Sequence, residues 1–235
     1  MMRRGSHCEL RRALSRLACG FMLTLLAGCV RQLPAISGVS RGVEPQILQQ
    51  CEAIFPAGPW QATHIIEASL PLGNDTSLIG VGAAARNPSE FRAVLMTEEG
   101  IVLLDASYRS GAIEVHRAVP PVDPEGFGRA MVGDVNLLLF RPRGNLTQVG
   151  RLETGESVCR WRNGDESVDV IAVGGRVVRL MRFDSTSLVR EVKIGPLDAR
   201  GLPSEAWLET KGMIGYSLHL KLLDFVSGDV GTETR

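Results

Sequence analysis

The sequence has few aromatic side chains and no excess of charge. Aromatic residues make up 5% of the 235 residues, so a hydrophobic core must be built mainly from aliphatic side chains. The formal net charge is zero, and residues 29–235 carry 21 basic and 25 acidic side chains. A mildly acidic domain of this kind argues against a nucleic-acid partner. About 200 residues with 44% hydrophobic content suit one globular domain.

The sequence also lacks the short motifs that carry most known chemistry. It contains no Gly-x-Ser-x-Gly nucleophile turn, no Cys-x-x-Cys pair and no dense acidic calcium loop. We therefore expect no catalytic residues, no metal and no cofactor, and a protein that is not an enzyme. His64 requires separate consideration as a catalytic residue, because its neighbours on the same strand face are apolar. A buried histidine bonded to backbone or water is the favoured interpretation, and a catalytic base is the alternative.

The N-terminus has the layout of an export signal. Five arginines precede a short apolar run from Leu17 to Leu26, which then leads into Leu26-Ala27-Gly28-Cys29. A bilayer span needs roughly 20 residues, so a run of about 12 predicts a cleaved segment. The pattern resembles a bacterial lipoprotein signal peptide with its lipobox, which implies cleavage between Gly28 and Cys29 and lipidation of the Cys29 thiol. Val30 is not aspartate, which favours the outer membrane and its periplasmic face.

The remaining chain divides into a tether, one domain and a tail. Residues 1–28 form the expected signal peptide, residues 29–44 a lipidated N-terminus and flexible tether, residues 45–226 the domain, and residues 227–235 a disordered tail. Pro45 opens a helical pattern whose apolar positions recur every three or four residues. A second helix is predicted over Glu125–Phe140, although three glycines weaken it.

Most of the domain shows the alternation of antiparallel strands. Turn sequences such as Asn163-Gly164 and Gly174-Gly175 separate short apolar runs, as two-residue hairpins do. The predicted strands are about ten: one from Trp60, then 75–84, 90–97, 100–107, 111–118, 157–162, 168–173, 176–183, 188–194 and 212–224. Asn145-Leu146-Thr147 is interpreted as a loop. The fold class is therefore mainly antiparallel β with a few helices (α+β), in which a sheet of this size must curl or close.

Two cysteines of the domain form an even pair. Acylation of Cys29 would leave Cys51 and Cys159, which an oxidising periplasm could join as a disulfide. Two separate buried thiols are the alternative, since sequence does not supply the distance between them.

The order of elements resembles the LolA/LolB superfamily of periplasmic lipoprotein carriers and receptors. The resemblance rests on Glu99–Ala106 followed by Gly111–Val115, on Pro120-Pro121-Val122-Asp123 leading into a helix, and on Asp134 before Leu137–Phe140. It implies an incomplete, strongly curled β-barrel of about 10–11 strands with a helical lid or plug. The matching hairpin tip, Thr97-Glu98-Glu99-Gly100, is polar where that family exposes an apolar residue.

This resemblance predicts a membrane-anchored periplasmic lipoprotein that binds or transfers acyl chains of lipids or lipoproteins. Its partners would be the membrane, through the N-terminal lipid, and those acyl chains. A structural or assembly lipoprotein with a filled core, docking a protein partner, is the alternative. Candidate cavity residues follow from strand alternation and are Leu95, Leu103, Ile113, Leu180, Val192, Leu218 and Leu220. An ordinary filled core would use the same residues.

Overall fold

A computed structural model describes residues 33–70, 74–85, 90–120, 123–212 and 215–228. The expected signal peptide, the lipobox residues Leu26, Ala27, Gly28 and Cys29, and most of the expected tail lie outside these described residues. No helix within them is long and apolar enough to cross a bilayer. The described chain from Leu33 onward forms one compact unit.

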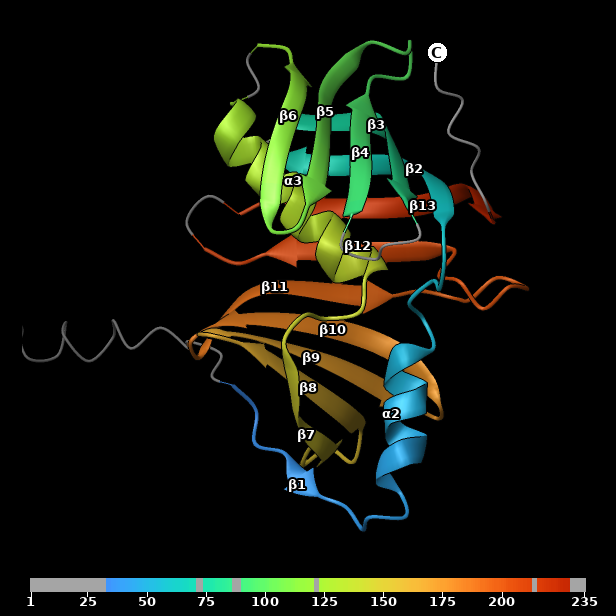
Figure 1. The fold of residues 1–235 in the computed structure, drawn as a ribbon, viewed down its shortest axis with the longest axis vertical. Coiled ribbons are helices and arrows are strands. Elements are labelled where there is room, and N and C mark those ends of the chain that lie inside the picture. The colour runs from blue at the N-terminus through green and yellow to red at the C-terminus, as the bar shows by residue number, and fades with distance from the viewer. Residues whose placement is uncertain (1–32, 71–73, 86–89, 121–122, 213–214, 229–235) are drawn as a thin grey trace, which may run out of the picture. The chain divides into compact units, whose positions relative to one another are not determined.

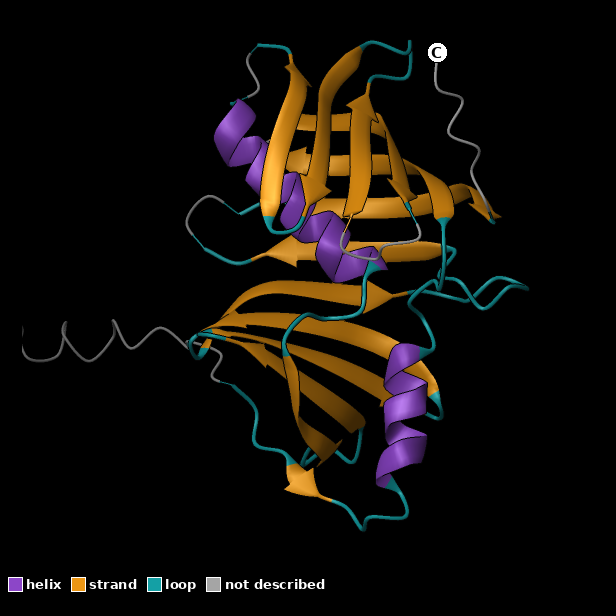
Figure 2. Cartoon of the chain, viewed as in Figure 1, coloured by secondary structure: helices purple, strands orange, loops and turns teal. Residues whose placement is uncertain are grey.

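Strands and two helices make up this unit (Figures 1 and 2). The helices are α2 (Glu44–Glu52) and α3 (Pro124–Leu139). The strands of the first half of the chain are β1 (Ser37–Gly38), β2 (Trp60–Leu70), β3 (Asn74–Ala84), β4 (Glu90–Met96), β5 (Val102–Arg109) and β6 (Ala112–Ala118). Those of the second half are β7 (Asn145–Arg151), β8 (Ser157–Asn163), β9 (Glu166–Val173), β10 (Arg176–Asp184), β11 (Ser187–Ile194), β12 (Glu205–Thr210) and β13 (Ser217–Ser227).

The strands form one open antiparallel sheet. Their spatial order is β1-β7-β8-β9-β10-β11-β12-β13-β2-β3-β4-β5-β6, so β1 and β6 are its two edges. The predominance of antiparallel strands agrees with the prediction. The sheet has 13 described strands instead of 10–11, and its two edges do not pair with each other.

Four strands were missed or misplaced by the prediction: β1, which lies in the expected tether, and β7, β12 and β13. Asn145-Leu146-Thr147 is part of β7 and not a loop, and it was missed because four of its first five residues are exposed or polar. β12 was missed because Trp207, which is 39% exposed, stands between the buried Ala206 and Leu208 and obscures the alternation of apolar and polar residues. The last strand begins at Ser217, five residues later than expected.

Each helix packs against a different part of the sheet (Figure 1). α2 places Ile47 and Cys51 against β8 and β9, in a core that includes the fully buried Leu180. α3 lies beside β2–β6, where Val132 joins a second core with Trp60 and Phe91. The Asp123 carboxylate begins α3 by accepting hydrogen bonds from the backbone N–H groups of Glu125 and Gly126.

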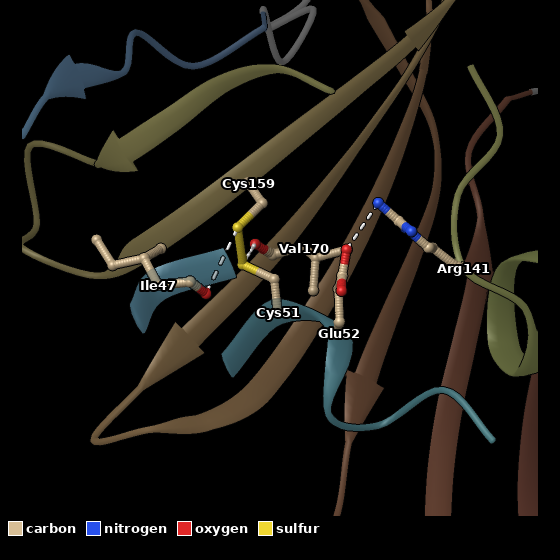
Figure 3. Close-up of a disulfide and its surroundings, with 6 residues drawn as sticks. All are labelled: Ile47, Cys51, Glu52, Arg141, Cys159 and Val170. Carbon is tan, nitrogen blue, oxygen red and sulfur yellow. Dashed lines mark hydrogen bonds and ion pairs between the residues drawn. A yellow bond between two sulfur atoms is a disulfide. The ribbon is translucent and has the colours of Figure 1, made fainter. Parts of the chain in front are cut away.

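A disulfide fixes α2 to the sheet. Cys51 on α2 is bonded to Cys159 on β8, with their Cα atoms 6.3 Å apart (Figure 3). Each sulfur also lies 3.7 Å from a backbone carbonyl oxygen, of Val170 and Ile47 respectively. At the end of the helix, the carboxylate of Glu52 pairs with Arg141 at 2.8 Å.

The outer face of β8–β11 is buried as well as the inner face. A third core there contains Val158, Ile171 and Phe183, and Leu33 and Ile36 pack against it. β1 pairs with β7 in the register Gly38↔Gly150. A Cβ atom on Gly150 would lie 2.1 Å from the carbonyl oxygen of Ser37, so glycine is required for this close approach. Residues 33–38 of the expected tether are thus packed on the sheet.

Candidate functional site

The candidate site is an apolar pocket on the inner face of the sheet, beneath α3. Its open volume is about 100 Å³, and it is only partly enclosed. Met131, Val135, Leu138 and Leu139 of α3 form one wall. The sheet and the neighbouring segments supply the rest: Ile54, Pro56, Ala62, His64, Ile66, Gly80, Val81, Gly82, Ala93, Val94, Leu95, Ile194, Leu202, Pro203, Glu205, Ala206, Leu220, Leu222 and Phe225.

The floor of the pocket is hollow because small residues stand in register on three adjacent strands. Ala62 of β2 pairs with Gly82 of β3, which pairs with Ala93 of β4. In the neighbouring row, by contrast, Trp60 and Phe91 flank Ala84 and fill the space with aromatic rings. A Cβ atom on Gly82 would make only ordinary contacts, 3.5 Å from Trp60 and 3.8 Å from Leu139. The hollow therefore results from the absence of side-chain volume in one row.

His64 is the polar group in the centre of this floor. It pairs across the sheet with Gly80 on one side and Leu222 on the other. Within the described part of the chain, no hydrogen bond or ion pair to the His64 ring is found. Burial lowers its pKa to about 4, because an apolar pocket disfavours the charged imidazolium. The ring is therefore neutral at pH 7, with one N–H donor and one nitrogen acceptor.

A buried polar cluster holds α3 over the inner face. Asp134 of α3 accepts a hydrogen bond from the Arg190 side chain of β11 at 2.5 Å and another from the Tyr216 hydroxyl at 2.5 Å. Burial raises the pKa of Asp134, and the charge of Arg190 opposes that rise. The cluster links the middle of α3 to β11 and to the residue that precedes β13.

The candidate residues named from sequence are distributed over several places. Leu95 and Leu220 line the pocket. Leu180 and Val192 are fully buried in the filled core beside α2, and Leu218 packs against that core. Ile113 packs against the core beside α3. On β5 the buried residues are Leu104, Ala106 and Tyr108, and Leu103 lies on the opposite face of the strand.

Other predicted features fall outside the pocket. His116 bonds to Ser107, and His219 contacts Glu67 and Glu205, all on the outer face. The β4–β5 hairpin tip is polar at Thr97–Gly100, but the next residue, Ile101, is 55% exposed. The described residues contain no cluster of three or more potential metal ligands. Sequence reasoning missed the row of small residues, because its signal depends on the pairing register of three strands.

The comparisons with known proteins give structural likenesses at low identity. No family model matches the chain, and no curated protein matches it significantly. Among solved structures, a LolA superfamily protein from Nitrosomonas europaea is 13% identical, with a TM-score of 0.49, over 80% of this chain and 94% of that one. A putative outer membrane lipoprotein-sorting protein domain from Vibrio parahaemolyticus is 9% identical, with a TM-score of 0.45, over 83% of this chain and 96% of that one.

A third structure has a similar level of likeness. A DUF1329 family protein from Desulfovibrio piger is 8% identical, with a TM-score of 0.44, over 84% of this chain and 96% of that one. These values do not place the chain in a family, so its function is argued from the pocket itself.

Proposed function

We propose that this protein is a membrane-anchored periplasmic lipoprotein whose pocket binds acyl chains of lipids or lipoproteins. The observation that carries the proposal is the hollow row of Ala62, Gly82 and Ala93 facing the apolar wall of α3. Burying an apolar chain there would be favourable by roughly 25 cal/mol per Å² of surface removed from water. Anchoring would come from lipidation of Cys29, after cleavage between Gly28 and Cys29.

The volume of the pocket limits what it can hold. Sites for drug-sized ligands are about 300–1,000 Å³, and the open volume here is about 100 Å³. The pocket as it stands accommodates a short segment of an acyl chain. Deeper entry would require α3 to move away from the floor. The lining includes no hydroxyl or thiol nucleophile among its described side chains, which favours binding over acyl transfer.

The disulfide supports the proposed location. Disulfides persist in oxidising compartments such as the periplasm, and Cys51–Cys159 is buried at the centre of the core beside α2. The Cys29→Ala variant tests the anchor: it should lose radioactive palmitate labelling and leave the membrane fraction. Continued labelling of that variant would contradict lipidation at Cys29.

Photo-crosslinking tests the pocket in the full-length protein. Cells that express the protein would be fed a fatty acid that carries a diazirine at its chain end and would then be irradiated. The protein would be purified, and its adducts would be mapped by mass spectrometry. We expect adducts on pocket residues such as Met131 and Leu222. Gly82→Leu fills the floor and should reduce these adducts at least tenfold, whereas Ala112→Leu on the exposed edge strand β6 should not.

A second variant covers the case in which Gly82→Leu fails to fold. Ala206→Leu fills the same pocket from β12 and should have the same effect. Adducts confined to other surfaces, or unaffected by both substitutions, would contradict the proposal. Such a result would favour a lipoprotein that docks a protein partner instead.

A further inference from the structure

We infer that the pocket selects acyl chains that carry a neutral oxygen group, such as an ester carbonyl or a hydroxyl, which bonds to the His64 ring. This inference rests on the proposed function, since it specifies which apolar ligands the same pocket prefers. Its basis is the position of an unpartnered imidazole on an otherwise apolar floor. A hydrocarbon ligand would leave that imidazole without a hydrogen bond, whereas an oxygen-bearing one would satisfy it.

The position of His64 is determined by the sheet. It lies on the inner face of β2 between Ala62 and Ile66, and all three residues line the pocket. Gly80, its partner on β3, has no side chain to cover or bond the ring. The end of the Ile66 side chain occupies the space over Gly80, 2.6 Å from where a Cβ atom would stand, so the neighbour of the ring on this side is apolar.

The nearby polar groups are used elsewhere. Glu205 contributes to the rim of the pocket, but its carboxylate contacts His219 on the outer face at 3.2 Å. The polar atoms of Asp134 are directed to Arg190 and Tyr216. The His64 ring is half-buried, and its nitrogens are not among the fully buried side-chain atoms that lack a partner, so water can reach them in the empty pocket. A hydrocarbon that covers the ring displaces this water without replacing its hydrogen bond, which costs about 1–3 kcal/mol. A ligand oxygen that supplies the missing bond therefore gains affinity that a plain hydrocarbon cannot.

The protonation state of the ring narrows the ligand class further. The neutral ring can donate its N–H to an ester carbonyl or exchange hydrogen bonds with a hydroxyl. A carboxylate is a poorer match, because a charged group in the apolar pocket would lack a cation to pair with. The ring also lacks an orienting carboxylate and a nucleophile within the described pocket, so binding is its role here.

Competition against the diazirine probe tests this inference. The full-length protein in lipid nanodiscs would be crosslinked in the presence of methyl decanoate, 1-decanol or undecane. For each protein, the undecane concentration that halves crosslinking is divided by the ester or alcohol concentration that does so. We expect this ratio to be about three- to tenfold higher in the wild type than in His64→Phe, as one neutral hydrogen bond implies. Expressing each result as a ratio between wild type and variant cancels the partition of the competitors into lipid.

Two variants separate hydrogen bonding from shape. His64→Phe keeps a ring of similar size but cannot bond, and it should lose the preference for oxygen-bearing chains. His64→Gln retains a donor and an acceptor and should keep part of it. Equal competition ratios in the wild type and His64→Phe, with crosslinking intact, would overturn this inference but not the proposed function. Absence of pocket crosslinking in the wild type would overturn both.

Discussion

Two Arg–Asp pairs in this sheet have the same geometry and opposite surroundings. Arg160 of β8 donates two hydrogen bonds to Asp169 of β9, at 2.6 and 2.7 Å. Arg92 of β4 donates two to Asp105 of β5, at 2.8 and 2.5 Å. The first pair is buried, with side chains 5% and 0% exposed, whereas the second has an arginine that is 61% exposed.

The difference arises from what covers the outer face of each half of the sheet. Over β8–β11, Leu33 and Ile36 pack against the third core, and the carbonyl oxygen of Pro34 accepts a further bond from Arg160 at 2.8 Å. This half is packed on both faces and crosslinked by the disulfide. The half formed by β2–β6 is packed on its inner face, and there it contains the hollow row. One half is therefore built for rigidity, and the other leaves room for a ligand.

Removing the buried carboxylate should have the largest effect. Asp169→Ala leaves the Arg160 guanidinium buried without its counterion, which costs about 3–5 kcal/mol of unfolding free energy. Urea denaturation monitored by tryptophan fluorescence measures the change. A loss below 1 kcal/mol would show that the two pairs are energetically alike and would break the comparison.

Removing the disulfide should have the next largest effect. The bond joins residues 108 positions apart, and loss of a native disulfide typically costs about 2–5 kcal/mol. The Cys51→Ala/Cys159→Ala double variant should show that loss in chemical denaturation. Pocket crosslinking under native conditions should remain, because the bond lies in the other half of the sheet. Loss of crosslinking in a folded double variant would show that the halves are coupled.

Acidification should act on the pocket half through His64. The pKa of His64 is about 4 in the folded state and about 6.5 when unfolded, so the unfolded chain takes up a proton first as the pH falls. The free energy of unfolding therefore has its full value above pH 6.5 and falls by about 3 kcal/mol as the pH drops towards 4. His64→Phe should remove this part of the pH dependence of unfolding. An unchanged profile would mean that the ring titrates normally.

Breaking the exposed pair should have the smallest effect. Asp105→Ala should cost about 0–1 kcal/mol, as exposed ion pairs do. Denaturation in the same urea series as Asp169→Ala gives the comparison directly. A loss of several kcal/mol of unfolding free energy would mean instead that an unrecognised partner buries the outer face over β4–β5.

The sequence predicts the strands with clear turns and alternation better than it predicts their packing. Asn163-Gly164 predicts the hairpin of β8 and β9, and Gly174-Gly175 predicts the hairpin of β9 and β10; the structure contains both. β7 lacks such a pattern because it lies near the sheet edge and exposes most of its residues. α3 was predicted over nearly its observed range, and the apolar Phe127 in its first turn is nevertheless 37% exposed.

The pocket depends on information that periodicity does not contain. Alternation places Ala62, Gly82 and Ala93 on inner faces, but only strand register brings the three small residues into one row. It cannot separate Leu180, which is fully buried, from Leu220, which lines the pocket. His64 was recognised as a polar residue among apolar ones, and its lack of a described partner required the structure.

The contact of Gly150 with Ser37 also determines where mechanical load enters the domain. In the lipidated form that we propose, any tension between anchor and domain passes through Leu33 and Pro34. Pro34 is bonded to Arg160, and β1 to β7, so the force is taken up by the doubly packed half of the sheet. The strands that form the pocket floor, β2–β4, are not on that load path. In that form the pocket floor would bear no load from the anchor, and even with β1 displaced the disulfide between α2 and β8 would lead the force into the same half of the sheet.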